Sequence, residues 1–259
     1  MQGNQMTKHT VSTKRAAFRK LHESGHFIIP NPWDIGGVRR LEKLGFKALA
    51  STSAGYAWSL GREDGGLTVD EMLAHLSALC AATDLPVNAD FEGGFADDPD
   101  GVAANVTRAV ATGVAGLSIE DITGTDLYPL SLAVERIHAA RAAIDRTGQD
   151  VLLVGRSEGY RVGRTNVDDT IARLVAYSAA GADVLYPPWV VDLGEIKAIV
   201  EAVAPKPVSI LLHNAGVNVA DLAAVGVRRM SVGARFASYA WAAFDRAALS
   251  VRDEGHLPF

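Results

Sequence analysis

The sequence has 259 residues, of which 48% are hydrophobic and 21% are charged. This length fits one large α/β domain or two small ones. The net charge of −5 gives no electrostatic reason to expect nucleic acid or an anionic membrane as a partner. Cys80 is the only cysteine, so an intrachain disulfide is excluded, and a reducing compartment is consistent with that.

No segment reaches the roughly 20 apolar residues that a membrane-spanning helix needs. The first residues are polar and basic and lack the apolar region of a secretory signal. We therefore expect a soluble cytoplasmic protein. Residues 1–24 are predicted to be a lead-in with a short helix over Lys14–Ser24, and residues 25–259 to form the main domain.

Eight short apolar runs recur along the chain and predict strands. Several are continuous rather than alternating, which is typical of parallel strands that are covered on both faces. The predicted strands are Phe27–Pro30, Lys47–Ser51, Pro86–Asp90, Ala115–Glu120, Val151–Arg156, Asp183–Tyr186, Pro207–Leu212 and Arg228–Val232.

The segments between these runs have apolar residues three and four positions apart, as amphipathic helices do. Glycines such as Gly45 and Gly113 stand between a helix and the next strand, a position that favours positive φ. The predicted helices are Ile35–Leu44, Val69–Ala82, Gly101–Ala111, Leu132–Arg146, Val167–Ala179, Gly194–Val203, Val219–Ala224 and Ala234–Asp253.

Eight strand–helix units without a flexible linker predict a single-domain α/β protein, a closed (β/α)₈ TIM barrel. A doubly wound open sheet is the alternative. It is disfavoured because the one glycine-rich strand exit, Phe91–Gly94, lacks a dinucleotide-binding fingerprint.

Charged residues gather at the predicted strand ends, where the active site of such a barrel lies. Asp90 and Glu92 follow the third strand, Glu120 ends the fourth, Arg156 ends the fifth, and Asp64 lies in the loop after the second. Crowded carboxylates repel one another unless a cation lies between them. Oxygen ligands without histidine or cysteine favour Mg²⁺ or Mn²⁺, which keeps several waters and takes one or two carboxylates directly. Arg156 is then placed to bind a substrate carboxylate in a bidentate pair.

Other acidic residues after strands have a simpler explanation, because an acidic side chain there often caps the next helix. We interpret Asp97, Asp98 and Asp121 in this way.

Simpler explanations also exist for other polar residues near the strand ends. The run Ser51–Ser53 could be turn chemistry, and Glu158 and His213 could equally be hydrogen-bonded residues that support the site from behind. Cys80 is interpreted as core packing, and the segment Arg161–Arg164 as a solvated loop.

Taken in order, the motifs at the strand ends resemble those of the isocitrate lyase/phosphoenolpyruvate mutase family over residues 27–235. The motifs are Asn31-Pro-Trp-Asp34, Leu60-Gly-Arg-Glu-Asp64, Asp90-Phe-Glu92-Gly-Gly, Ile119-Glu120-Asp121, Gly155-Arg-Ser-Glu158, Gly181-Ala-Asp-Val-Leu-Tyr186 and Asn214.

The resemblance implies a role for each carboxylate. Asp90 is similar to the direct Mg²⁺ ligand, while Asp64, Glu92 and Glu120 are similar to carboxylates that hold the ion directly or through water. Asp64, Glu120 and Arg156 are the residues expected to take part in catalysis.

The resemblance also implies which residues contact the substrate. Ser51, Thr52 and Ser53 match the strand exit whose hydroxyl and backbone N–H groups hold the substrate carboxylate and 2-oxygen. Arg156 matches an arginine that binds the substrate from the opposite side, and Asn214 a further substrate contact.

Members of this family act on small 2-oxo or 2-hydroxy carboxylates through a metal-bound enolate, so the resemblance implies a carbon–carbon lyase. They assemble as dimers or tetramers and often exchange the last helix, which implies a homodimer or homotetramer. The aromatic stretch Ala234–Phe244 is compatible with such an interface and equally with a helix that closes its own barrel.

The sequence departs from the family after the fourth strand. The segment Ile122–Leu130 contains no cysteine, lysine or histidine, whereas the lyases carry a Lys-Lys-Cys-Gly-His-type loop there, with the cysteine as proton donor. Pro187-Pro188 also replaces a frequent Pro-Glu pair. Tyr128, Tyr186 or a metal-bound water remains as the acid, unless the reaction needs no strong acid, as in decarboxylation.

Three hypotheses follow for the function. The first is a Mg²⁺-dependent lyase or decarboxylase of a small 2-oxo or 2-hydroxy acid. The second is carbon–phosphorus bond chemistry of the phosphonopyruvate type, and the third is a non-catalytic protein that binds a metal and a carboxylate.

Overall fold

The computed structural model describes residues 9–213 and 216–258. Within them, eight parallel strands form two hydrogen-bonded sheets, β1-β10-β9 and β2-β3-β4-β7-β8. In order around the barrel the strands are β1 (Phe27–Ile29), β2 (Leu49–Ala50), β3 (Val87–Asp90), β4 (Gly116–Glu120), β7 (Leu152–Arg156), β8 (Val184–Tyr186), β9 (Ser209–Leu211) and β10 (Arg229–Ser231).

Two contacts join the sheets into one closed barrel. The amide of Ala50 in β2 donates to the carbonyl of Pro30 after β1 at 3.0 Å. On the other side a parallel bridge links Leu185 in β8 with Val208 before β9. The predicted (β/α)₈ architecture is therefore confirmed.

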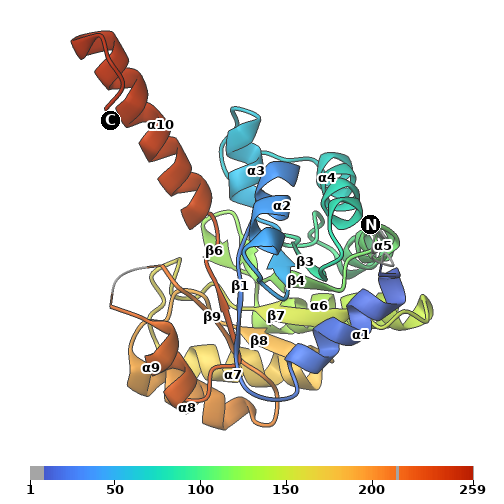
Figure 1. The fold of residues 1–259 in the computed structure, drawn as a ribbon. Helices are drawn as coiled ribbons and strands as arrows, with labels where there is room; N and C mark the ends of the chain where they lie inside the picture. Colours follow the sequence, from blue (N-terminus) through green and yellow to red (C-terminus); the bar gives the residue numbers. More distant parts are fainter. Residues whose placement is uncertain (1–8, 214–215, 259) are drawn as a thin grey trace.

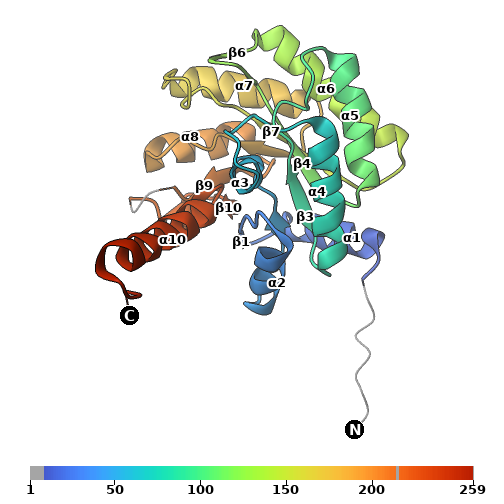
Figure 2. The same ribbon diagram turned by 90° about the horizontal axis from the view of Figure 1, so that it is seen from above.

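Helices surround the strands on the outside (Figures 1 and 2). Those that follow the strands are α2 (Ile35–Lys43), α4 (Val69–Ala82), α5 (Pro99–Ala111), α6 (Leu130–Arg146), α7 (Val167–Ala179), α8 (Leu193–Val203), α9 (Val219–Ala224) and α10 (Arg235–Glu254).

Two small elements were not expected from the sequence. A short helix, α3 (Ser53–Ser59), follows β2 directly, and the hairpin of β5 (Ile122–Thr123) and β6 (Asp126–Leu127) follows β4. Both lie in strand-to-helix loops, so they shape the end of the barrel that carries the predicted site.

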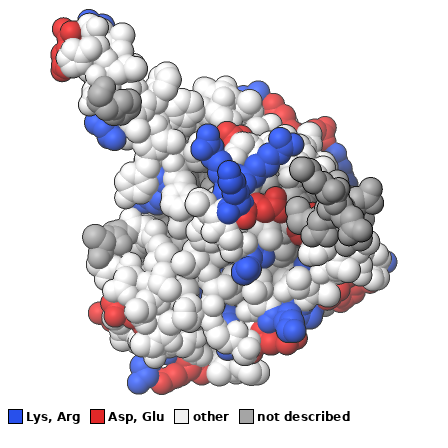
Figure 3. Space-filling model, viewed as in Figure 1, with Lys and Arg blue, Asp and Glu red and all other residues white. Residues whose placement is uncertain are grey.

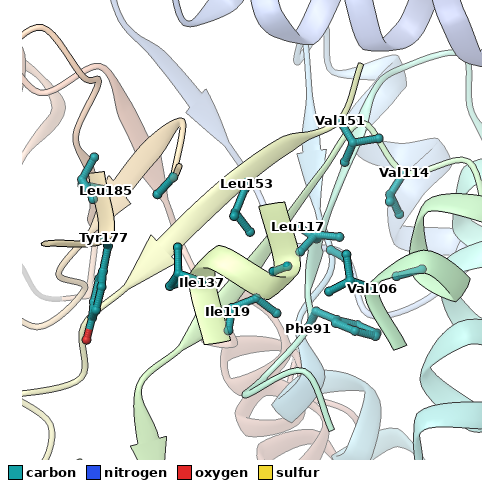
Figure 4. Packing of buried hydrophobic residues seen from close by; sticks show 14 of the residues in the cluster. Phe91, Val106, Val114, Leu117, Ile119, Ile137, Val151, Leu153, Tyr177 and Leu185 are labelled. Atoms are coloured by element: carbon teal, nitrogen blue, oxygen red, sulfur yellow. The ribbon is translucent and has the colours of Figure 1, made fainter. Parts of the chain in front are cut away.

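The outer core fills the space between the strands and the helices. Leu117 and Ile119 of β4 and Leu153 of β7 point towards Val106 of α5 and Ile137 of α6, and all five are almost completely buried (Figure 4). Burial of one such side chain stabilises the fold by about 1.5–3 kcal/mol. Because alternate residues of a strand face opposite sides, this packing turns the intervening residues, Glu120 among them, into the barrel.

The opposite end of the barrel is covered by α1 (Val11–Leu21), which begins three residues before the predicted Lys14 because Thr10 caps it. Phe18 of α1 is fully buried against interior residues that include Phe27. A Cβ on Gly116, the first residue of β4, would lie 2.8 Å from the Phe18 ring, so glycine makes room for it. Cys80 is buried in α4, which confirms its interpretation as core packing.

Helix α10 extends away from the barrel (Figures 1 and 2). Its aromatic side chains Tyr239 and Phe244 are largely exposed, and the surface of the helix seen in Figure 3 is mainly uncharged. Within residues 9–213 and 216–258, no helix is both long and apolar enough to cross a membrane.

Candidate active site

A cavity of about 1130 Å³ opens at the carboxyl ends of the strands. The five charged residues predicted from the sequence, Asp64, Asp90, Glu92, Glu120 and Arg156, all line it. Parallel strands bring them together because their last residues end at the same rim of the barrel.

Arg156, at the end of β7, lies at the centre of the site. Its Nη1 atom is 3.0 Å from Asp90 Oδ1, its Nη2 atom is 3.2 Å from Glu120 Oε2, and its Nε atom donates to Glu158. Burial lowers the pKa of Arg156, but the charges of Glu158, Glu120 and Asp90 outweigh it and keep that pKa well above its ordinary value. Each of its three nitrogen atoms thus already faces a carboxylate of the protein.

Glu158 supports Arg156 from behind, as one of its two interpretations expected. It is completely buried, and its second carboxylate oxygen accepts from Trp189 Nε1 at 3.0 Å. Since both oxygens are engaged, Glu158 fixes the plane of the Arg156 guanidinium.

Asp121 is not the helix cap that the sequence suggested. It is buried, and it accepts hydrogen bonds from the Glu158 amide at 2.8 Å and the Tyr177 hydroxyl at 2.6 Å. Asp97 is not a helix cap either; it accepts a hydrogen bond from the Tyr128 hydroxyl, and both residues line the cavity. Asp98 is the cap of α5, accepting from the Gly101 amide at 2.8 Å, as predicted.

The hydroxyl run after β2 divides into different roles. Ser53 faces the cavity, where its amide and hydroxyl donate to Asp90 Oδ2 at 2.9 and 2.8 Å. Thr52 also lines the cavity and caps α3, with its hydroxyl accepting from the Gly55 amide. Ser51 is fully buried and does not line the cavity; its hydroxyl accepts from the Asp90 amide at 2.9 Å. Ser51 therefore positions the Asp90 backbone.

Glu92 and Glu120 are carboxylates in an environment that opposes their charge. Burial, and then the charges of Asp90 and Asp64, raise the pKa of Glu92 to about 7, and burial raises the pKa of Glu120. Among the described residues, Glu92 Oε1 is buried without a hydrogen-bond partner. Glu92 also has a left-handed backbone with φ of 46°, a strained conformation that is common at functional sites.

The donor set fits a hard divalent cation. Three carboxylates, Asp90, Glu120 and Glu158, face one guanidinium, so these four groups have a formal charge of −2 when all are ionised. Glu92 lines the same cavity. The described part of the chain contains no group of three or more His, Cys, Asp or Glu residues arranged to bind a metal ion. Carboxylate oxygens are ligands that Mg²⁺ prefers, and this ion takes one or two of them directly and keeps water in its other positions.

Asp64 lies at the mouth of the cavity and is paired with Arg161, whose Nη2 atom is 3.1 Å from Asp64 Oδ2. The segment Arg161–Arg164 was predicted to be a solvated loop. This is correct for Arg164, which is exposed and pairs with Asp126 of the hairpin. The same prediction misses that Arg161 lines the cavity. The only sequence signal for this was its place five residues after the end of β7.

The candidate acids are both tyrosines with occupied hydroxyls. Tyr128 donates to Asp97, and the Tyr186 hydroxyl lies 2.7 Å from Ser231 Oγ. Burial is the main cause that raises the pKa of Tyr128 and the pKa of Tyr186, so both are neutral at pH 7. Asn214, the last predicted substrate contact, lies outside the described residues.

A carboxylate-rich site at the strand ends of a (β/α)₈ barrel is the arrangement of an enzyme active site, and lyases and mutases are among the enzymes built in this way. The family model described as phosphoenolpyruvate phosphomutase matches residues 18–252. An oxaloacetate decarboxylase of Bradyrhizobium sp. is 31% identical over 236 residues, covering 86% of this chain and 78% of the relative.

Solved structures agree with these matches. The crystal structure of a Burkholderia cenocepacia protein provisionally described as a lyase/mutase superposes with a TM-score of 0.92 at 47% identity, covering 95% of this chain and 91% of the other. A 2,3-dimethylmalate lyase, a member of the PEP mutase/isocitrate lyase superfamily, gives a TM-score of 0.85 at 25% identity, covering 96% and 89%. The chain therefore belongs to the phosphoenolpyruvate mutase/isocitrate lyase family, as the strand-end motifs indicated.

Proposed function

We propose that the protein is a magnesium-dependent lyase that cleaves a carbon–carbon bond of a small 2-oxo or 2-hydroxy carboxylic acid through an enolate, with decarboxylation of an oxaloacetate-like acid as the reaction. The observation that carries the proposal is the excess of carboxylates around one buried guanidinium at the strand ends. The similarity to an oxaloacetate decarboxylase supports it.

Asp90 is the proposed direct ligand of the ion, with Glu92, Glu120 and Asp64 holding it directly or through water. When bound, Mg²⁺ (or Mn²⁺) supplies positive charge beside the carboxylate and 2-oxygen of the substrate. Ser53, at the start of α3, keeps the Asp90 carboxylate in place by two hydrogen bonds.

Arg156 has an electrostatic role in this proposal. Cleavage moves an electron pair from the breaking carbon–carbon bond into the enolate while carbon dioxide leaves. Negative charge then develops on the 2-oxygen, and the fixed guanidinium of Arg156 stabilises it without reorganisation. The enolate later takes one proton on carbon.

The segment after β4 favours decarboxylation over a cleavage that needs a strong acid. It forms the β5–β6 hairpin and carries no cysteine, histidine or lysine. Tyr128 and Tyr186, two of the tyrosines that line the cavity, are weak acids at neutral pH because burial raises the pKa of each. Release of carbon dioxide needs no proton at the moment of bond cleavage, so this site is sufficient for it.

The test is pyruvate release from oxaloacetate with Mg²⁺, corrected for the rate without protein because the metal alone promotes this reaction. We expect a rate above that background that chelation with EDTA removes, and no enzymatic rate in Asp90→Ala. Asp98→Ala, which removes a helix cap outside the cavity, should remain active. Unchanged turnover in Asp90→Ala would refute the proposal.

Carbon–phosphorus chemistry is the second candidate, because the matching family model is that of phosphoenolpyruvate phosphomutase. Turnover of phosphonopyruvate without turnover of oxaloacetate would replace the first proposal by this one. A rise in melting temperature with Mg²⁺ and oxalate, without turnover of any acid, would instead identify a non-catalytic binding protein.

A further inference from the structure

We propose that Arg161 binds a second, distal carboxylate of the substrate and so makes the site selective for dicarboxylic 2-oxo or 2-hydroxy acids. This inference rests on the proposed function, because it assigns the substrate class of the same site. The inference is supported by a comparison of the positively charged side chains that line the cavity.

A substrate with two carboxylates needs a positive charge for the second one, and within the described residues the cations that line the cavity are all arginines. They are Arg136, Arg156, Arg161, Arg229 and Arg235.

Three of the five are already used by the protein and are buried. Arg156 is only 14% exposed and faces three carboxylates. Arg136 is fully buried and donates to the backbone carbonyls of Gly93 and Ala96. Arg229 is buried in the barrel, where its Nε atom donates to Ser209. Removal of a buried group from its partners is costly, so none of these can leave them to pair with a distal carboxylate of the substrate.

Arg161 differs because its partner can be exchanged. The side chains of Arg161 and Asp64 are 37% and 38% exposed, and their ion pair stands at the cavity mouth. Exposed ion pairs contribute little to stability, since water solvates both charges when they separate. A substrate carboxylate can therefore replace Asp64 at Arg161 with little loss.

The loop that carries Arg161 is held in place on both sides. Tyr160 donates to Glu195 Oε2 of α8 at 2.8 Å, and Arg164 forms an ion pair with Asp126 of the hairpin at 2.6 Å. These contacts keep Arg161 over the cavity, whereas the side chain of Arg235 makes no hydrogen bond or ion pair among the described residues. A positioned guanidinium loses less freedom on binding, so Arg161 is the better distal site.

The test uses two stable ligands that differ only in the distal carboxylate, malate and lactate, titrated calorimetrically in Mg²⁺. A charge-assisted bond to a guanidinium predicts that wild-type protein binds malate about 10- to 100-fold more tightly than lactate. In Arg161→Gln this ratio should fall to about one with lactate affinity unchanged, and Arg161→Lys should give an intermediate ratio.

Arg108→Gln is the control, because it removes an exposed, ion-paired arginine that neither lines the cavity nor holds the Arg161 loop. It should keep the wild-type ratio. Equal binding of malate and lactate by the wild type, a ratio that survives in Arg161→Gln, or a ratio lost instead in Arg235→Gln would each overturn the inference.

Binding and turnover separate the two proposals. A malate preference that depends on Arg161, in a protein that releases no pyruvate from oxaloacetate, keeps this inference and refutes the decarboxylase. Turnover of oxaloacetate in a protein without that malate preference keeps the decarboxylase and refutes this inference.

Discussion

At the scale of single residues, Asp121 connects three elements behind the active site. It follows β4, and it accepts from Ser157 and Glu158 after β7 and from Tyr177 of α7. Arg173 adds an ion pair at 3.2 Å. Replacement by alanine leaves Arg173 without its carboxylate and the buried Tyr177 hydroxyl without its acceptor, so we expect Asp121→Ala to lower the free energy of unfolding by about 3–5 kcal/mol.

Urea unfolding measures this effect, and Asp98→Ala is the control. Loss of the α5 cap should cost only about 1 kcal/mol. A loss of similar size in the two variants would show that Asp121 acts as an ordinary cap.

Two buried histidines make stability depend on pH. Burial, and then the charge of Arg229, lower the pKa of His22 to about 3, and burial lowers the pKa of His75 to about 4. Histidine in the unfolded chain has a pKa near 6.5. Between that pH and the lower pKa values in the folded protein, the unfolded chain binds more protons than the folded one, so acid favours unfolding. From pH 7 to pH 5 each histidine should therefore remove about 1–2 kcal/mol of stability.

Urea unfolding at the two pH values tests this, with His22→Asn and His75→Asn as variants. Each variant should lose less stability on acidification than the wild type does. An identical loss in all three proteins would exclude these histidines as the cause.

At the scale of elements, α1 belongs to the barrel interior although it precedes the first strand. Phe18 fills the space at the start of the strands beside Phe27. We expect Phe18→Ala to cost about 3–5 kcal/mol of unfolding free energy in urea, because it leaves a cavity. Val11 of the same helix is 42% exposed, and Val11→Ala should cost less than 1 kcal/mol. Equal costs would mean that α1 does not cover the barrel.

The elements also show what the sequence can predict. Barrel strands are buried on both faces and so read as apolar runs, which is why all eight were predicted. The helix α3, whose sequence is Ser-Ala-Gly-Tyr-Ala-Trp-Ser, has no clear apolar spacing, and the strands β5 and β6 have two residues each. Elements this short do not contain enough residues for a periodic pattern to predict them.

The same distinction applies to the site. Asp90 and Glu120 were predictable because neighbouring parallel strands end at one rim. The contacts of Arg156 with Glu158 and of Arg161 with Asp64 depend on how far side chains reach between loops. Sequence position alone does not fix that reach.

At the scale of the whole molecule, α10 leaves an apolar surface without a covering element. Tyr239 is 72% exposed and Phe244 is 63% exposed. Exposed apolar surface of this kind marks an interaction site, and we propose that it packs against a second copy of the chain in a homodimer or homotetramer. Its first turns also form cavity wall, since Arg235 and Ser238 line the cavity.

Phe244→Asp should therefore dissociate the oligomer, because a buried carboxylate without a partner is strongly unfavourable in an interface. Light scattering after gel filtration should show a dimer or tetramer for the wild type and a monomer for this variant. Arg252→Gln, a change near the exposed end of the same helix, should leave the assembly intact. A monomeric wild type would contradict the proposal.

Oligomer and cavity are connected through the start of α10. A Cβ on Gly55 of α3 would lie 3.3 Å from the Cβ of Ala237, so the first turn of α10 packs closely on the helix that follows β2. A second copy that holds α10 also holds Arg235 and Ser238 at the cavity wall. The monomeric Phe244→Asp variant should then bind malate more weakly than the wild type, although Phe244 itself does not line the cavity. Calorimetry on that monomer decides the point, because unchanged affinity would show that each barrel completes its own site.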